Sequence, residues 1–254
     1  MEMVEIYNEK SNVPIVFSVE HASNHIPDHL NNLGLSQDLL ENHIAWDIGA
    51  KALALELSNR IGGRAIFSGF SRLLIDPNRR AEQIGFIPEV SDGILIPGNQ
   101  NLTEVDVNHR VDAFYTPYHH ALQKTIKGYL DVKVRPLVIG IHSFTPEMEG
   151  QMRPWQIGFM WDKDDRLAKA LIPTFEKAEK TIGHNDPYGG DEFFHTMSSS
   201  GGHHGLAHTQ VEIRQDLMGD LDNIFHWADL LEEAIGNALN VDDLFTNFKK
   251  TKDL

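Results

Sequence analysis

Three short apolar segments of this chain each end on or near a histidine or glutamate, and this pattern constrains the fold more than any other feature. The segments are residues 14–19, followed by Glu20 and His21; residues 136–141, followed by His142; and residues 207–213, which contain Glu212. Apolar runs of this length are typical of buried strands. Open α/β sheets bind ligands at the carboxyl ends of their strands. We therefore expect His21, His142 and Glu212 to meet at one edge of a sheet.

Segments with helical periodicity separate these strands, which predicts an α/β fold. The predicted helices are residues 37–43, 46–61, 103–126 (opened by a Thr103–Asp106 capping box), 164–182 (kinked or broken at Pro173) and 222–239. Further strands are expected at 64–67, 72–75 and 156–161. Strands that alternate with long helices favour a mainly parallel mixed sheet with helices on both faces, a three-layer sandwich. We expect residues 1–254 to form one such domain.

Composition excludes several classes of function. The chain has no cysteine and 14 histidines, so a metal would be held by histidine and carboxylate, as is typical of catalytic zinc sites. The net charge of −15 disfavours nucleic acid and anionic membranes as partners. It does not exclude a small anionic substrate bound by local arginines. The acidic N-terminus and the lack of a long apolar run predict a soluble cytoplasmic protein; the oligomeric state is not predicted.

His21 and His142 are the first candidate metal ligands. A lone histidine at a strand end usually forms a hydrogen bond to a loop, but two at equivalent ends, with Glu212 at a third, favour a metal. The third ligand is open at this point. Asp47, at the expected start of a helix, is one candidate, although a carboxylate there also suits the helix dipole. The other candidates are Asn24, His25 and His43.

Glu212 is predicted to be a general base, because a glutamate within an apolar strand is costly to bury unless it is paired or functional. The alternative is an ion pair with Arg72 or Arg214.

Arg72, Arg79 and Arg80 surround Asn78 in a turn-forming segment, and an asparagine with arginines suits the recognition of a substrate carboxylate. The expected substrate-binding residues are Arg72, Asn78, Arg79, Arg80, Ser143 and Arg214. Two long loops, 76–101 and 189–205, are expected to set substrate choice; the histidine cluster in the second favours a solvated loop over a second metal site.

Five segments in this order resemble N-formylglutamate amidohydrolases over roughly residues 14–218. They are 18–24 with Ile26-Pro27, 46–50, 72–79, 141–146 and 211–217. The family is similar to zinc carboxypeptidases. This resemblance implies a zinc-carboxypeptidase-like fold, His142 as a zinc ligand, Asn78 and Arg79 as carboxylate binders and Glu212 as the base. In the carboxypeptidase pattern His-x-x-Glu follows the first strand; here Asn24 replaces that glutamate, and we expect Asp47 to supply the missing ligand.

The resemblance implies a zinc amidohydrolase that removes a formyl or similar acyl group from N-formyl-L-glutamate or a related acidic N-acyl amino acid. Zinc would be held by His21, Asp47 and His142. Two alternatives remain open. One is a carboxypeptidase-like or deacylating hydrolase of another small amide. The other is a non-catalytic metal- or anion-binding relative, which an intact Glu212 argues against.

Overall fold

A seven-stranded mixed sheet forms the centre of the protein, as seen in a computed structural model that describes residues 3–148, 150–190 and 193–248. Its strands are β1 (Val4–Tyr7), β2 (Ile15–Val19), β3 (Arg64–Ser68), β6 (Leu137–Phe144), β9 (Ile157–Met160), β10 (Ile182–His184) and β11 (His208–Arg214). Two small hairpins lie outside this sheet: β4 (Val90–Ser91) with β5 (Ile94–Leu95), and β7 (Glu147–Met148) with β8 (Gln151–Met152).

The strand order is β1-β3-β2-β6-β11-β9-β10. The central strands β3, β2, β6 and β11 are parallel, β1 pairs antiparallel with β3, and β9 pairs antiparallel with β11. Strands β2, β6 and β11 are buried almost throughout, which explains their apolar sequences. The mainly parallel mixed sheet expected from the sequence is confirmed.

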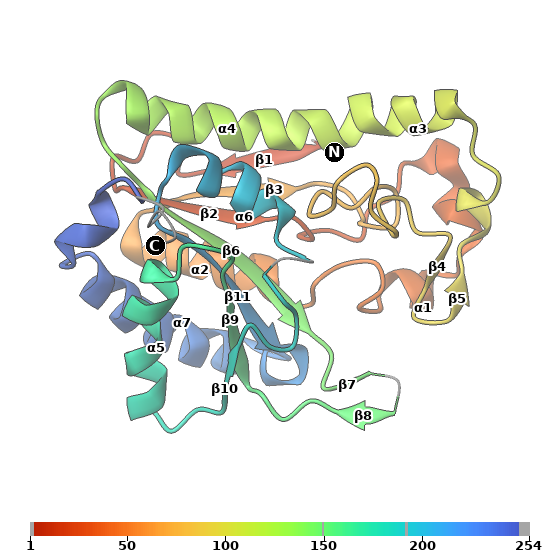
Figure 1. Cartoon of the computed structure of the whole chain (residues 1–254). Helices are drawn as coiled ribbons and strands as arrows, with labels where there is room; N and C mark the ends of the chain where they lie inside the picture. The colour runs from red at the N-terminus through yellow and green to blue at the C-terminus, as the bar shows by residue number, and fades with distance from the viewer. Residues whose placement is uncertain (1–2, 149, 191–192, 249–254) are drawn as a thin grey trace, which may run out of the picture.

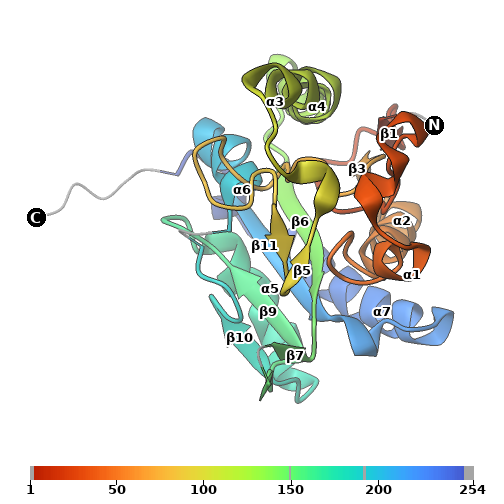
Figure 2. The same cartoon turned by 90° about the vertical axis from the view of Figure 1, so that its right-hand side faces the viewer.

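Helices cover both faces of the sheet (Figures 1 and 2). On one face, α2 (Ala50–Ile61), α5 (Arg166–Lys177) and α7 (Leu221–Ala238) form one buried apolar cluster with the strands. On the other face lie α3 (Glu104–Arg110), α4 (Thr116–Asp131) and α6 (His195–Ser199). The π-helical segment η3 (Val111–Tyr115) joins α3 to α4, and the two lie in line along the top of Figure 1. The remaining helical segments are α1 (Gln37–Leu40), η1 (Asp28–Gly34), η2 (Pro97–Asn99), η4 (Gly202–His204), η5 (Gln215–Leu217) and η6 (Asp242–Phe245).

Several elements differ from the sequence-based expectation. Residues 72–74 form a turn and residue 75 has no regular structure, so the expected strand is absent and Arg72 lies on a loop. Helix α5 runs through Pro173 unbroken, because Pro173 and the Lys169 carbonyl that loses its partner both lie on the exposed side. The expected helix to residue 182 ends at Lys177, and residues 182–184 form β10. The Thr103–Asp106 capping box is confirmed.

The start of α2 is set by Gly49, four residues later than the sequence predicted. Gly49 has a left-handed conformation with φ of 85°, so residues 46–48 remain an irregular segment and α2 begins at Ala50. A Cβ atom built on Gly49 would lie 2.7 Å from the Cβ of Met218. The glycine therefore allows a sharp turn directly after Asp47, and this turn frees Asp47 to point back toward the sheet edge. Among the described helices, none has the length and apolar character needed to cross a membrane.

We expect Gly49→Ala to lower the free energy of unfolding by at least about 1 kcal/mol, because a side chain is strained in the left-handed region and collides with Met218. Gly236→Ala is the matched control. Gly236 lies inside α7 with no atom within 4 Å of a built Cβ, so alanine there should raise stability by up to about 1 kcal/mol. Urea unfolding of both variants measures the difference; an equal effect of the two changes would contradict this role of Gly49.

Candidate functional site

The carboxyl ends of three adjacent parallel strands bring the candidate residues together. In the register of the sheet, Glu212 of β11 lies beside His142 of β6. Strand β2 flanks β6 on its other side, and His21 follows β2 by two residues. The expected meeting of His21, His142 and Glu212 at one sheet edge is confirmed, with the difference that His142 lies within β6, which continues to Phe144.

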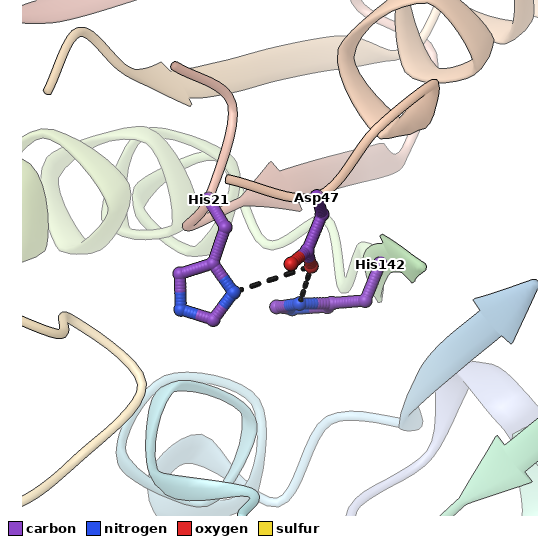
Figure 3. Close-up of side chains that lie close together, drawn as sticks. All are labelled: His21, Asp47 and His142. Atoms are coloured by element: carbon purple, nitrogen blue, oxygen red, sulfur yellow. Dashed lines mark hydrogen bonds and ion pairs between the residues drawn. The ribbon is translucent and has the colours of Figure 1, made fainter. Parts of the chain in front are cut away.

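Asp47 lies between the two histidines (Figure 3). Its Oδ2 atom is 3.2 Å from Nδ1 of His21 and 2.8 Å from Nδ1 of His142. One ligand atom from each of the three residues falls within 4.8 Å of the others, and all three residues are buried. The backbone N–H of Asp47 donates to the His21 carbonyl, which fixes the loop over the strand end. Two imidazole nitrogens and a carboxylate oxygen therefore converge on one small volume.

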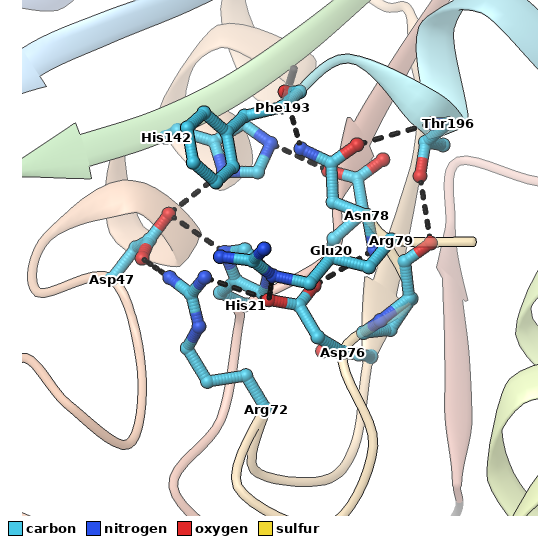
Figure 4. A network of polar contacts seen from close by, with 12 residues as sticks. Glu20, His21, Asp47, Arg72, Asp76, Asn78, Arg79, His142, Phe193 and Thr196 are labelled. Carbon is cyan, nitrogen blue, oxygen red and sulfur yellow. Dashed lines mark hydrogen bonds and ion pairs between the residues drawn. The ribbon is translucent and has the colours of Figure 1, made fainter. Parts of the chain in front are cut away.

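Each histidine also contacts a buried carboxylate through its other ring nitrogen (Figure 4). Nε2 of His21 lies 2.9 Å from Oδ1 of Asp76, and Nε2 of His142 lies 2.7 Å from Oε2 of Glu20. Metal-binding histidines commonly have such a carboxylate partner, which keeps the proton on the outer nitrogen and directs the inner lone pair toward the metal. The two outer carboxylates thus orient both Nδ1 atoms toward Asp47.

The carboxylates raise the affinity of both imidazoles for positive charge. Burial lowers the pKa of His142, but Asp47 and Glu20 outweigh it and raise the pKa well above the ordinary value. Burial and Arg72 lower the pKa of His21, whereas Asp76 and Asp47 raise it above the ordinary value in sum. The cluster attracts protons or, in their place, a metal cation.

Asp76 links His21 to the arginines of the loop. Its Oδ2 lies 2.7 Å from Nη2 of Arg72 and 3.4 Å from Nε of Arg79, and its Oδ1 accepts the backbone N–H of Asn78. Burial raises the pKa of Asp76, but Arg72 and His21 hold it well below the ordinary value. Nη1 of Arg72 also lies 3.5 Å from Oδ1 of Asp47. These arginines are therefore held against the histidine–aspartate cluster by ion pairs.

Among the described residues, Glu212 makes no ion pair with an arginine or lysine. Arg72 and Arg214, the partners considered from the sequence, are paired with Asp76 and Asp216 instead, so the ion-pair interpretation of Glu212 is wrong. Its Oε1 accepts a hydrogen bond from Nε2 of Gln210 at 2.8 Å, and its Oε2 is buried without a hydrogen-bond partner in the described part of the protein. Burial raises the pKa of Glu212 to about 7. A carboxylate with that pKa can exchange a proton with water or substrate near neutral pH.

A cleft of about 490 Å³ opens over this cluster. It is lined by His21, Asp47, Arg72, Asp76, Asn78, Arg79, His142, Ser143 and Glu212 from the sites described above. Both long loops named from the sequence reach it: the first contributes Ile84, Gly85, Pro88, Val90, Ser91 and Asp92, and the second contributes Phe193. The first loop is not structureless, since it contains the β4–β5 hairpin and η2.

Not every expected substrate-binding residue faces the cleft. Arg80 is exposed and lines a separate cavity of about 180 Å³. Arg214 turns away to bind Asp216 and the Arg153 carbonyl. Asn78 does line the cleft, but its side chain binds Phe193, Gln210 and Thr196 and so holds the two loops together. The hydroxyl of Ser143 is buried and lacks a hydrogen-bond partner among the described residues.

The other candidate ligands lie outside the cluster. Asn24 donates to the Leu40 carbonyl, and Nε2 of His43 lies 3.3 Å from Asp92 at the rim of the cleft. His25 is not part of the cluster of His21, Asp47 and His142. The sequence reasoning missed the roles of Glu20 and Asp76, the partners of the histidines, although Glu20 was visible as an acidic residue directly before His21. It also missed Tyr188, which reaches the cleft from a loop with no recognisable motif.

Comparisons with known proteins agree with this architecture. The family model of N-formylglutamate amidohydrolase matches residues 13–218. The crystal structure of a gene product of Agrobacterium tumefaciens is similar, with a TM-score of 0.92 and 36% identity over 96% of this chain and 97% of that one. An N-formylglutamate amidohydrolase from Ralstonia eutropha JMP134 shares the fold, with a TM-score of 0.73 and 19% identity over 95% of this chain and 100% of that one. A comparison with curated proteins found no match. Since the family model spans well over half of the sequence, this chain belongs to the N-formylglutamate amidohydrolase family.

Proposed function

We propose that this chain is a zinc-dependent amidohydrolase that removes a formyl or similar acyl group from an N-acyl amino acid. N-formyl-L-glutamate or a related acidic N-acyl amino acid is the substrate that family membership suggests. The observation that carries the proposal is the convergence of His21, Asp47 and His142 at one sheet edge beside Glu212. This donor set supports a zinc-carboxypeptidase-like site, and Glu212, buried and unpaired with any described cation, supports catalysis over mere binding.

The residues present fit a divalent cation. Two histidines and a carboxylate are the protein ligands of many catalytic zinc sites, which leave a position open for water. The buried carboxylates Glu20, Asp47 and Asp76 outnumber the guanidinium groups of Arg72 and Arg79. The remaining negative charge is compensated by protons on His21 and His142 or, in their place, by a cation held by His21, Asp47 and His142. Bound zinc supplies an acidified water and polarises the scissile carbonyl.

Within this site, different residues transfer the proton and bind the substrate. Glu212 accepts the proton of the attacking water and returns it to the leaving nitrogen, as a pKa near 7 suits both directions. Arg72 and Arg79 face the cleft and bind the substrate carboxylate, while Asp76 fixes their positions. Ser143 lines the cleft, and its buried hydroxyl, which has no hydrogen-bond partner among the described residues, would bind a polar atom of the substrate after rotation about its Cα–Cβ bond.

The zinc content of the protein should depend on His21, Asp47 and His142. We expect His142→Gln and Asp47→Ala to lose stoichiometric zinc, measured by elemental analysis after dialysis, with the fold checked by circular dichroism. His43→Gln is the matched control, because His43 lines the same cleft but contacts Asp92. Full zinc occupancy in the folded Asp47→Ala protein would exclude Asp47 as a ligand.

Glu212→Gln should keep zinc and a near-normal KM but lose at least about 100-fold in kcat, because glutamine cannot accept the proton of water. The formate-release assay measures this, and Glu147→Gln, an exposed change on β7, should be silent. If Glu212→Gln unfolds the protein while the folded fraction stays active, Glu212 has a structural role and not the proposed one.

The pH profile should report the raised pKa of Glu212. A general base must be deprotonated, so kcat/KM should fall as the pH decreases, with an apparent pKa well above that of an ordinary glutamate. The residual activity of Glu212→Gln should lack this acidic limb. A limb that is the same in both proteins would assign it to another group.

Arg79→Gln should lower kcat/KM for an N-formyl amino acid at least about tenfold, because a charged hydrogen bond to the substrate is lost. It should also remove the preference for the α-carboxylate over the α-carboxamide form of the substrate. Arg80→Gln and Arg214→Gln are controls, since neither guanidinium faces the cleft. Equal losses in all three variants would show that Arg79 acts through general charge alone.

A further inference from the structure

We propose that the part of the cleft that receives the substrate's side chain is apolar. This chain would then prefer an N-acyl amino acid with one carboxylate and an apolar side chain to N-formyl-L-glutamate. The inference rests on the proposed function and narrows its substrate class. Two independent observations support it. The residues that line the cleft include few positively charged side chains, and they include three exposed apolar side chains.

The cleft holds few cations for a doubly charged substrate. Among the described residues that line it, the arginines are Arg72 and Arg79, and there is no lysine. Both arginines already share Asp76. His43 is paired with Asp92, and burial lowers the pKa of His43, so it is mainly neutral at pH 7. The arginine pair can accept one substrate carboxylate. A second carboxylate, on the side chain, would find no further arginine or lysine among the described lining residues, which disfavours its burial.

A further cation, Arg153, contacts two residues of the cleft lining and is already occupied. Its Nη1 donates to the Tyr188 hydroxyl at 3.0 Å, and its guanidinium lies 5.0 Å from the Tyr188 ring centre. Its Nη2 atom is 2.5 Å from the sulfur of Met148. Tyr188 and Met148 line the cleft, whereas Arg153 is not among its lining residues. Arg153 would therefore have to leave these contacts to bind a side-chain carboxylate in the cleft.

Three exposed apolar side chains line the cleft, two from the loop of residues 76–101 and one from β7. Ile84 is 95% exposed, Val90 of β4 is 55% exposed and Met148 of β7 is 42% exposed, and all three line the cleft. Single exposed apolar residues are common on protein surfaces. Three exposed apolar residues in the same cleft as the His21–Asp47–His142 cluster indicate a surface that an apolar group of a ligand covers.

The test compares substrates that differ only in their side chain. The zinc-loaded full chain is assayed for formate release from N-formyl-L-leucine, N-formyl-L-glutamate and N-formylglycine. We expect kcat/KM for the leucine compound to exceed that for the glutamate compound at least about tenfold, a ratio within the range of apolar-pocket discrimination. A preference for the glutamate compound would overturn the inference and leave the proposed function intact.

Variants assign the preference to the apolar wall. Val90→Thr and Met148→Gln should each lower the leucine-to-glutamate ratio, because they keep shape but add polarity. Met152→Gln is the matched control: Met152 lies on the paired strand β8, is 69% exposed and does not line the cleft. Unchanged ratios in Val90→Thr and Met148→Gln, or an equal change in Met152→Gln, would overturn the assignment.

Binding separates the inference from the proposed function. The affinities of the same compounds for the zinc-loaded Glu212→Gln protein are measured by calorimetry. Tighter binding of the leucine compound supports the apolar subsite independently of the chemical step. Absence of turnover with all three compounds, together with tighter binding of the leucine compound, would remove the proposed function and keep the inference. Equal or tighter binding of the glutamate compound would remove the inference.

Discussion

The contact of one carboxylate oxygen of Asp47 with the Nδ1 atoms of both His21 and His142 is the interaction on which the site depends. It requires three things of the fold. Parallel strands β2 and β6 must end side by side, the chain must return over that edge, and Gly49 must allow a sharp turn before α2. Together these place three buried ligand atoms within 4.8 Å, which is close enough for one cation.

The two histidines differ in the surroundings of the carboxylate that contacts their Nε2 atom. Glu20, the partner of His142, is fully buried, and its second oxygen accepts the hydroxyl of Ser18, which also contacts Tyr118. Asp76, the partner of His21, is bound to Arg72 and Arg79, which face the cleft. One ligand is therefore supported by the core and the other by the proposed substrate-binding loop. The second arrangement connects recognition of a substrate carboxylate to the electrostatic environment of the proposed metal.

The sequence was sufficient for the parts of the site that depend on regular strands. Apolar runs located β2, β6 and β11, and parallel pairing then brought His21, His142 and Glu212 together. It was insufficient where loop geometry decides. Arg80 and Arg214 are close in sequence to residues of the site, but their side chains point elsewhere because Arg80 lies beyond the turn and Arg214 binds Asp216. Asp76 belongs to a turn-forming segment, and nothing in the local sequence shows that its side chain reaches His21.

Anomalous diffraction at the zinc absorption edge, from crystals of the zinc-loaded protein, tests the proposed metal site most directly. We expect one strong peak bonded to Nδ1 of His21, Nδ1 of His142 and an oxygen of Asp47, each at about 2.0–2.2 Å. Glu212 should lie beside the remaining coordination position without being a ligand. A peak at His203 or His204, or a peak whose ligands exclude Asp47, would contradict this assignment.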